Sequence, residues 1–357
     1  MTDNETKTTT LRRWAGYLLK FGVPLLVTVL LCVLLFRDIN FGEMMAIIRT
    51  QCNFWWIGLA LVISIFSHIF RAMRWRIQLR AMGINPPLFT LVLSIFGTYA
   101  VNLVLPRLGE VWRTGYIAGR QDAPFSKVFG SMVADRLADT VTVLLLTIVT
   151  FMLATNQLGR YLSDNGGNYT RILDILTSPW IWVGAAACIA FAWWFLAHRS
   201  HNAFVVKVQN FVYGLWAGFA SIAHMRGKGM WLLLTVCIWG CYFVQLYVAF
   251  YAFGFTADIL SQYGITAALV TFVLSSISMG VPSNGGIGPW QWSVILALGL
   301  YGLAQEPAAA FANLVMGAQT LLLILLGIFT FVCIALDKNK KSAPANKKSA
   351  LTAKKQI

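Results

Sequence analysis

Long apolar segments separated by short polar stretches make up most of the chain. Six of these segments are uninterrupted, at 17–36, 54–69, 128–153, 179–197, 230–253 and 309–336. A helix needs about 20 apolar residues to cross the hydrocarbon core of a bilayer, and these segments have about that length. The pattern therefore predicts an all-α polytopic membrane protein with about six spanning helices.

Two further apolar stretches, 88–119 and 264–301, are each interrupted near the middle by a polar motif that contains glycine and proline. The motifs read NLVLPRLGEVWR and VPSNGGIGPWQW. Unwound backbone inside a bilayer is tolerated only where it is buried in protein or lines a water-filled cavity. Interrupted segments at corresponding places in two halves also indicate a transport site. We therefore expect two broken hairpins beside a cavity.

The basic residues predict how the segments are oriented, because lysine and arginine collect in cytoplasmic connections. They cluster at Arg12/Arg13/Lys20, Arg71/Arg74/Arg76/Arg80, Arg120/Lys127, Arg199/Lys207/Arg226/Lys228 and after Asp337. The connections 37–53, 154–179 and 254–263 have sparse or balanced charge and are expected to face outward. Both ends of 88–119 then face inward, and both ends of 264–301 face outward.

This arrangement predicts two oppositely oriented re-entrant hairpins and an inverted-topology repeat. The half-repeats 17–153 and 179–336 each contain a broken hairpin followed by a span, which is the organisation of many transporters. In the alternative interpretation, each interrupted stretch is one kinked spanning helix followed by a surface helix. That alternative would place Arg120 and Lys127 outside.

The domain organisation follows from the same pattern. We expect one membrane domain at 17–336, preceded by a cytoplasmic N-terminal tail, 1–16, and followed by a disordered basic cytoplasmic tail, 337–357. The C-terminal tail has seven lysines and one aspartate, and so contributes +6 to the net charge of +15. Lysines near anionic inner-leaflet lipid gain about 1 kcal/mol each. The tail lacks the aromatic residues that stack on nucleic-acid bases, so lipid is its expected partner and nucleic acid is not.

Three charges lie inside the segment 128–153. Asp135, Arg136 and Asp139 fall roughly 12 to 18 Å along the helix from Lys127 at 1.5 Å per residue. Each unpaired charge at that depth costs about 2.5 to 3.5 kcal/mol, so these residues need partners. The first hairpin offers Arg107, Glu110 and Arg113. We expect one buried polar cluster, which is either part of a transport site or a salt-bridge lock between the hairpin and the span.

The second hairpin carries no charge in its motif, but its glycines favour anion binding. Gly285, Gly286 and Gly288 can take positive φ, and successive backbone N–H groups can converge on an anion. The candidate substrate-binding residues are Asn102, Arg107, Glu110, Arg113, Asp135, Arg136, Asp139, Asn284, Gly285, Gly286, Gly288 and Gln291. No metal site and no cofactor is expected.

An enzymatic function is less favoured by the sequence. The chain contains no H-E-x-x-H, G-x-S-x-G, Walker A or dinucleotide glycine motif, so no catalytic residue is assigned. A membrane-embedded transferase, or an accessory subunit, acting on a polyprenyl-phosphate or phospholipid substrate stays open. In that alternative, the side chains of Arg107, Glu110, Asp135 and Asp139 would hold a phosphate through a metal.

Four motifs resemble a known family. They are R-x-x-R-W at 71–75, N-x-x-x-P-R-x-G-E-x-x-R at 102–113, D-R-x-x-D at 135–139 and P-x-x-G-G-I-G at 282–288. Together they resemble the transmembrane domain of lysylphosphatidylglycerol synthases and their stand-alone flippase-like relatives, over residues 12–336. The family pattern usually has an acidic residue where this chain has Gln291. Proton coupling or amine binding is therefore not expected at that position.

The resemblance implies a flippase-like lipid transporter without the soluble synthase domain. We expect it to move a phospholipid, an aminoacylated lipid or a lipid-linked glycan between the leaflets of a bacterial-type inner membrane, with both termini cytoplasmic. In this hypothesis Arg107, Arg113 and Arg136 hold the lipid phosphate, and the carboxylates hold an amine or cycle protons. A second copy or a separate lipid-modifying enzyme is the expected protein partner.

Overall fold

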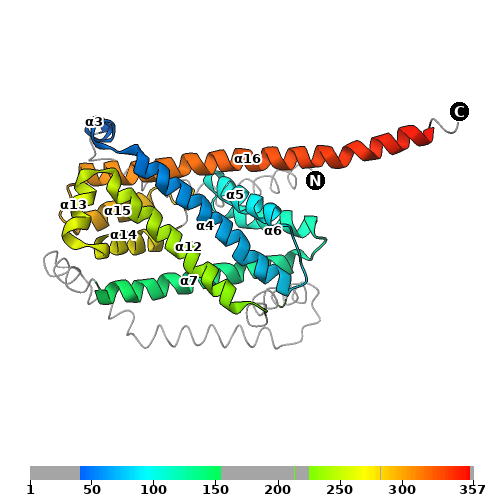
Figure 1. Ribbon diagram of the computed structural model, residues 1–357, viewed down its shortest axis with the longest axis horizontal. Coiled ribbons are helices and arrows are strands. Elements are labelled where there is room, and N and C mark those ends of the chain that lie inside the picture. Colours follow the sequence, from blue (N-terminus) through cyan, green and yellow to red (C-terminus); the bar gives the residue numbers. More distant parts are fainter. Residues whose placement is uncertain (1–40, 154–212, 214–224, 282, 354–357) are drawn as a thin grey trace, which may run out of the picture.

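The computed structural model describes residues 41–153, 213, 225–281 and 283–353, and the regular elements in these ranges are all helices (Figure 1). The predicted tail 1–16 and the predicted spans 17–36 and 179–197 lie outside the described residues. The elements are α3 (Phe41–Gln51), α4 (Phe54–Ala81), α5 (Leu88–Val104), α6 (Leu108–Arg120), α7 (Phe125–Leu153), α12 (Lys228–Ala249), η2 (Phe250–Ala252), α13 (Gly254–Tyr263), α14 (Ile265–Ser278), α15 (Pro289–Gly299) and α16 (Gln305–Ala353).

Several helices match a bilayer in length and composition. These are α4, the joined α12 and η2, and the Gln305–Asp337 part of α16, while α13 and α14 pass the same test together as a pair bent by 112°. The 29 residues of α7 extend for about 43 Å, which also exceeds the roughly 30 Å of a hydrocarbon core. The protein is therefore an all-α polytopic membrane protein, as predicted.

The second predicted span is longer than the sequence indicates. It was expected to end at 69, but α4 begins after the cap residue Asn53 and continues to Ala81. The interpretation of Arg71 and Arg74 as residues of a cytoplasmic connection is therefore wrong, because both lie inside the helix and are buried. Arginine, glutamine and leucine are good helix formers, and acidic partners on α7 compensate the buried charge.

Two predicted connections are also partly or wholly helical. The helix α3 occupies much of the stretch 37–53, and α13 occupies all of 254–263. Met44 of α3 packs against Ala309 and Ala310 of α16. The backbone N–H of Asn53 donates to the carbonyl of Ala252, 2.8 Å away. The starts of α4 and α16 and the end of η2 therefore gather at one end of the bundle, which we call the α3 end.

At the opposite end of the bundle, the ends of α4 and α6 lie near the start of α7 and near Asp337 of α16. Lys127 Nζ donates to the carbonyl of Met82 at 2.9 Å, which brings the start of α7 to the end of α4. Arg120, the last residue of α6, forms an ion pair with Asp337 of α16. We call this region the Asp337 end.

The first interrupted stretch is a re-entrant hairpin. Its helices α5 and α6 pack against each other and are separated by the break at 105–107. Leu88 at the start and Ala123 just past the end pack on one apolar cluster together with Met82. Both ends of the hairpin therefore lie at the Asp337 end, and the alternative of a kinked span is wrong for this stretch.

The second interrupted stretch is a hairpin that opens at the opposite end. Its helices α14 and α15 also pack against each other. The rings of Tyr263 and Tyr301, which flank the stretch, lie 4.9 Å apart. Tyr301 belongs to a buried cluster with Ile57 and Phe253, which are near the start of α4 and the end of η2. The second hairpin therefore opens at the α3 end, and the two hairpins are oppositely oriented, as predicted.

The helix contacts have an approximate two-fold pattern. If α4, α5, α6 and α7 are matched with α12, α14, α15 and α16, the contacts α4–α5, α5–α6, α6–α7 and α5–α16 correspond to α12–α14, α14–α15, α15–α16 and α14–α7. In addition, α4 packs on its own counterpart α12. Matched helices run in opposite directions, as Figure 1 shows for α4 and α12 and for α7 and α16. This is the arrangement that an inverted repeat requires.

The last helix extends beyond the predicted span. It was expected to end at 336 and to be followed by a disordered tail, but the backbone of α16 is helical to Ala353. A preceding span removes the cost of helix nucleation, and the alanines and lysines of the tail are good helix formers. The prediction of a disordered tail from residue 337 therefore differs from the structure up to that point.

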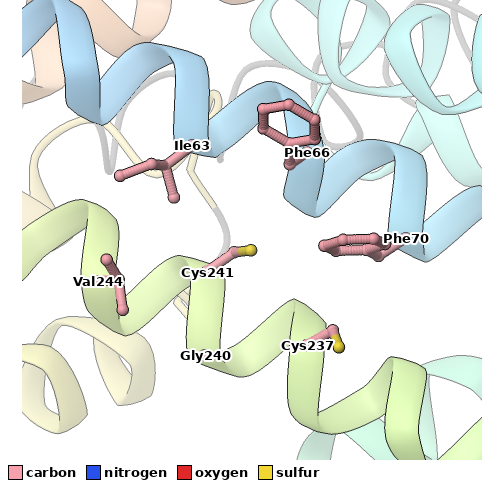
Figure 2. A pocket seen from close by; sticks show the side chains of 7 residues that line it. All are labelled: Ile63, Phe66, Phe70, Cys237, Gly240, Cys241 and Val244. Carbon is pink, nitrogen blue, oxygen red and sulfur yellow. The ribbon is translucent and has the colours of Figure 1, made fainter.

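An apolar groove of about 410 Å³ lies between α4 and α12 (Figure 2). Its lining residues come from both helices and carry no charge: Ile63, Phe66, Phe70, Cys237, Gly240, Cys241 and Val244. Phe66 and Val244 are exposed, so the groove belongs to the outer surface of this helix pair. The polar residues of interest lie elsewhere in the bundle.

Candidate functional site

Four charged side chains form a buried quartet between α4 and α7. Arg71 Nη1 lies 2.7 Å from Asp139 Oδ2, and Arg74 Nη2 lies 2.7 Å from both Asp135 Oδ1 and Asp139 Oδ1. Arg74 Nε also donates to Asp135 at 2.9 Å. The side chains are at most 12% exposed. Two guanidinium groups and two carboxylates thus neutralise one another away from water.

Helical spacing explains why this quartet forms. Arg71 and Arg74 are three residues apart, and Asp135 and Asp139 are four apart, so each pair lies on one face of its helix. The sequence pattern predicts partners for both aspartates on the first hairpin, and that prediction is wrong, because Arg71 and Arg74 of α4 are the partners. The R-x-x-R spacing on a helix facing D-x-x-x-D was the available signal. Hydropathy does not show this signal, because arginines that follow an apolar segment have the composition of a cytoplasmic connection.

Hydrogen bonds to α12 extend the quartet. Arg71 Nη2 donates to the hydroxyl of Tyr242 at 3.3 Å, and Arg74 Nη1 donates to the hydroxyl of Thr235 at 3.3 Å. The Tyr242 hydroxyl also lies 3.5 Å from that of Tyr99 on α5. The quartet therefore ties together helices from both halves of the repeat, which is the geometry of a structural lock.

A second, more accessible ion pair connects this lock to the first hairpin. Arg136 Nη2 lies 3.0 Å from Glu110 Oε1 and its Nη1 lies 4.0 Å from Asp139. The side chain of Arg136 is 35% exposed and that of Glu110 is 17% exposed. Asn102 Nδ2 donates to Glu110 at 3.2 Å, and Asn102 Oδ1 accepts the backbone N–H of Gly109 at 2.8 Å. The structure thus brings together Asn102, Glu110, Arg136 and Asp139, and their part in substrate binding stays a prediction.

Arg113 forms no ion pair with these residues, although it is close enough to interact with the charges of Arg136, Asp135 and Glu110. Its side chain is fully buried, and its guanidinium carbon lies 4.4 Å from the centroid of the Trp75 ring. Its three nitrogens have no hydrogen-bond partner in the structure. A cation over an indole face is stabilised by the ring quadrupole. In this conformation a lipid phosphate cannot contact Arg113 unless α6 moves.

The breaks of the two hairpins meet each other. Arg107 has a left-handed backbone with φ 60°, and its Nη2 donates to the carbonyl of Gly280 at 2.8 Å. Beside this bond, Leu103 of α5 lies against Gly285. Because Gly280 and Gly285 flank the interruption between α14 and α15, residues from two breaks far apart in sequence form one junction.

The glycines of the second break are required by its backbone. Gly285, Gly286 and Gly288 have φ of 64°, 86° and 94°, a region that other residues adopt at a cost. A Cβ on Gly286 would lie 2.3 Å from the sulfur of Met279. Asn284 lies at the start of this turn, and its Oδ1 is buried without a partner. The sequence prediction of an anion-binding turn at these residues stays a prediction.

Gln291 holds this turn against the last span. Its Oε1 accepts the backbone N–H of Gly288 at 2.6 Å, and its Nε2 donates to Asn313 Oδ1 on α16 at 3.2 Å. Asn313 Nδ2 in turn donates to the carbonyl of Ala309 at 2.8 Å. Both ends of the Gln291 amide are thus occupied. Gln291 is buried, with 6% of the residue exposed, and its side chain fixes the turn.

Comparisons with known proteins show the family of this chain. The family described as "Lysylphosphatidylglycerol synthase TM region" matches residues 22–327. The chain is also similar to UPF0104 membrane protein MJ1595 of Methanocaldococcus jannaschii, with 19% identity over 309 residues that cover 80% of this chain and 87% of that protein. No solved structure matches. The match spans both hairpins and the charged cluster, and the chain belongs to the lysylphosphatidylglycerol synthase transmembrane-region family.

Proposed function

We propose that this protein is a flippase-like transporter that moves a lipid between the two leaflets of a membrane. The lipid headgroup passes between the two hairpin breaks while its acyl chains stay in the bilayer. The substrate is a phospholipid, an aminoacylated lipid or a lipid-linked glycan, all of which carry phosphate. The observation that carries this proposal is the junction at which Arg107 of one break bonds Gly280 of the other, beside the accessible Arg136–Glu110 pair.

A polar path is what a headgroup needs inside a bilayer. An unpaired central charge costs about 2.5 to 3.5 kcal/mol on insertion scales, so a phosphate crosses readily only along compensating groups. Arg136 has the required exposure and a single close partner at 3.0 Å. Guanidinium groups bind phosphate in a bidentate geometry. In the proposed mechanism, Arg136 holds the phosphate, and the released Glu110 holds an amine of the headgroup or a proton.

The charged residues divide into two groups in this proposal. Arg71, Arg74, Asp135 and Asp139 form the buried lock that fixes α4, α7 and α12 in place. Arg136, Glu110 and Asn102 form the polar pair and its support beside the first break. Each of the three carboxylates already has an arginine partner within 3.0 Å, which favours headgroup exchange over a metal-held phosphate.

The membrane location and partners are part of the same proposal. The Asp337 end is cytoplasmic, the α3 end faces outward, and both termini are cytoplasmic in a bacterial-type inner membrane. The lysines beyond residue 337 bind anionic lipids of the inner leaflet through charge attraction. A separate enzyme that modifies the lipid, or a second copy of this chain, is the proposed protein partner.

The experiment that tests the proposal is reconstitution into vesicles with a panel of labelled lipids. The panel contains an anionic phospholipid, a zwitterionic phospholipid, an aminoacylated phospholipid and a polyprenyl-linked sugar. Quenching of outer-leaflet label measures exchange, and mass spectrometry detects covalent change. We expect exchange of at least one of these lipids above protein-free vesicles, without conversion. Conversion would support the transferase alternative, and neither exchange nor conversion would contradict both.

A pair of matched variants ties exchange to the site. Arg136→Gln removes the proposed phosphate ligand and should slow exchange by about tenfold, equivalent to roughly 1.4 kcal/mol of barrier. Arg80→Gln removes the same charge from an exposed position outside the site and should leave exchange unchanged. Equal effects of the two substitutions would contradict the assignment of Arg136.

A further inference from the structure

The junction between the two breaks contains one polar and one apolar contact. The polar contact is the hydrogen bond from Arg107 Nη2 to the Gly280 carbonyl, 2.8 Å long and exposed. The apolar contact is close packing of Leu103 on Gly285, where a Cβ would lie 2.6 Å from Leu103 Cδ2. Each contact joins one residue of the first hairpin to one of the second. Together they hold the two breaks against each other.

Arg107, which forms the polar contact, has an unusual backbone conformation. Arg107 is the residue before α6 and has φ 60°, which is uncommon for a residue with a side chain. Strained backbone persists where the surrounding structure determines it, often at switch regions. Here the left-handed turn accompanies a side chain that reaches across to the second hairpin. The acceptor is a neutral carbonyl, and among the described residues no carboxylate forms an ion pair with the Arg107 guanidinium.

We propose that this junction is a latch that is closed in the present conformation and is opened by an anionic headgroup. The inference rests on the proposed lipid transport, since the headgroup is the transported lipid's own phosphate. The guanidinium of Arg107 already makes a charge-assisted bond to the neutral Gly280 carbonyl. A phosphate adds attraction between opposite charges and can accept two parallel N–H bonds from the guanidinium, which a single carbonyl cannot do. A phosphate therefore displaces the Gly280 carbonyl from Arg107, and Leu103 then separates from Gly285.

The latch is connected to the ion pair that receives the phosphate. Asn102 adjoins Leu103 and bonds both Glu110 and the N–H of Gly109. When a phosphate binds Arg136, Glu110 loses its ion pair and its hydrogen bond with Asn102 changes. Asn102 is next to Leu103 in sequence, so this change reaches the apolar contact. Binding at Arg136 and release at Leu103 are thus coupled through one short segment of α5.

A double-cysteine variant tests the latch. A Cβ on Gly285 would lie 3.9 Å from the Cα of Leu103, so cysteines at the two positions are close neighbours, and small adjustments bring their Cβ atoms to the roughly 3.5 to 4.5 Å of a disulfide. In Leu103→Cys with Gly285→Cys the bulky isobutyl group that would crowd the new Cβ is absent. On a background without native cysteines, we expect a disulfide to form on mild oxidation. It should abolish lipid exchange in vesicles, and a reductant should restore it.

A second measurement follows the opening of the latch in detergent, where no transport takes place. The rate of disulfide formation is followed in detergent with dioctanoyl phosphatidylglycerol, and with dioctanoylglycerol as the control that lacks phosphate. We expect the phosphate-bearing probe to slow cross-linking by about threefold or more, which is about 0.6 kcal/mol. With Arg107→Gln added, the phosphate-bearing probe should no longer differ from the control.

The outcomes separate the latch from the transport proposal. Full exchange by the cross-linked protein, or an equal cross-linking rate with both probes, overturns the latch and leaves transport standing. A folded double variant that never cross-links also overturns it. If the parent protein moves no lipid, the proposed function fails, and the response of the cross-linking rate still decides whether an anion opens the junction. The single variants Leu103→Cys and Gly285→Cys are the non-cross-linking controls, and whatever exchange each supports should not respond to oxidant or reductant.

Discussion

At the scale of single residues, burial separates the two kinds of ion pair in this protein. The side chains of Arg74 and Asp135 are fully buried, whereas that of Arg136 is 35% exposed. A buried charge that loses its partner is left uncompensated, but a partly exposed one can be solvated. The quartet is therefore expected to control stability, and the Arg136–Glu110 pair to control transport.

Substitutions of two acidic residues test this division. Asp139→Asn leaves two buried arginines to share the one remaining carboxylate of the quartet, that of Asp135, and we expect a loss of about 3 to 5 kcal/mol in the free energy of unfolding. Glu110→Gln should cost less than Asp139→Asn, because Arg136 is partly exposed and keeps Asp139 as a second partner at 4.0 Å, and it should slow lipid exchange. Unfolding of purified protein in detergent and exchange in vesicles measure the two effects. Normal stability of Asp139→Asn would contradict the lock.

Gln291 gives a prediction with a pH dependence. In Gln291→Glu, the atom that replaces Nε2 faces Asn313 Oδ1 at about the parent distance of 3.2 Å, and an ionised carboxylate there meets an acceptor. Asn313 can turn its amide only by losing its bond to Ala309. Ionisation is favoured as pH rises, so the variant should be less stable at pH 8 than at pH 5 relative to the parent. Gln291→Leu, which cannot ionise, should lose stability equally at both values, and a flat profile for Gln291→Glu would contradict the bracing role.

At the scale of elements, the first hairpin depends on one close approach between its helices. A Cβ on Gly109 would lie 2.1 Å from the backbone carbonyl oxygen of Thr98, whereas a Cβ on Gly115 of the same helix would meet nothing within 4 Å. The contact with Thr98 is made by backbone and cannot be relieved by a side-chain rotation. The packing of α5 on α6 therefore requires glycine at one position and not at the other.

This difference predicts opposite effects for the same substitution. Gly109→Ala should destabilise the protein by about 1 to 3 kcal/mol or more through overpacking. Gly115→Ala should stabilise it by up to about 1 kcal/mol, because alanine favours helix over glycine. Thermal unfolding in detergent compares them directly. A neutral Gly109→Ala would show that α5 and α6 are not packed as described.

The elements that could be predicted from sequence are those with a strong local signal. Glycine and proline within apolar stretches marked both breaks, and the basic clusters gave the correct opposite orientation of the hairpins. The end of α4 could not be predicted in the same way, because Arg71 and Arg74 have the composition of a cytoplasmic connection. Only the tertiary contact with Asp135 and Asp139 makes them part of a helix, and a hydropathy pattern does not contain that contact.

The sequence predicted the charged cluster of the candidate site but not the contacts between the two hairpins. The cost of charges inside an apolar span predicted that Arg136 needs a partner, and the charged residues of the first break, Glu110 among them, were the expected source. The bond from Arg107 to Gly280 and the bracing of Gly288 by Gln291 join residues whose contact depends on how two hairpins meet. No periodicity within either segment carries that information.

At the scale of the whole molecule, the two-ended arrangement makes a prediction about topology. Asp122 is exposed near the Asp337 end and Asp258 is exposed on α13 at the α3 end. On a background without native cysteines, Asp122→Cys should react with an impermeant maleimide only from the cytoplasm and Asp258→Cys only from outside. Labelling of both from the same side would contradict the membrane placement of the two ends.

The central claim is that a lipid headgroup lies between the two breaks during transport. Its most direct test is photo-cross-linking in vesicles with a phospholipid that carries a photoreactive group on its headgroup, followed by mass spectrometry of the adducts. We expect adducts on both 102–110 and 279–286, and fewer of them when Arg136→Gln is introduced. Adducts confined to exposed apolar positions of α12, such as Leu232, Leu233 and Val236, would contradict the account.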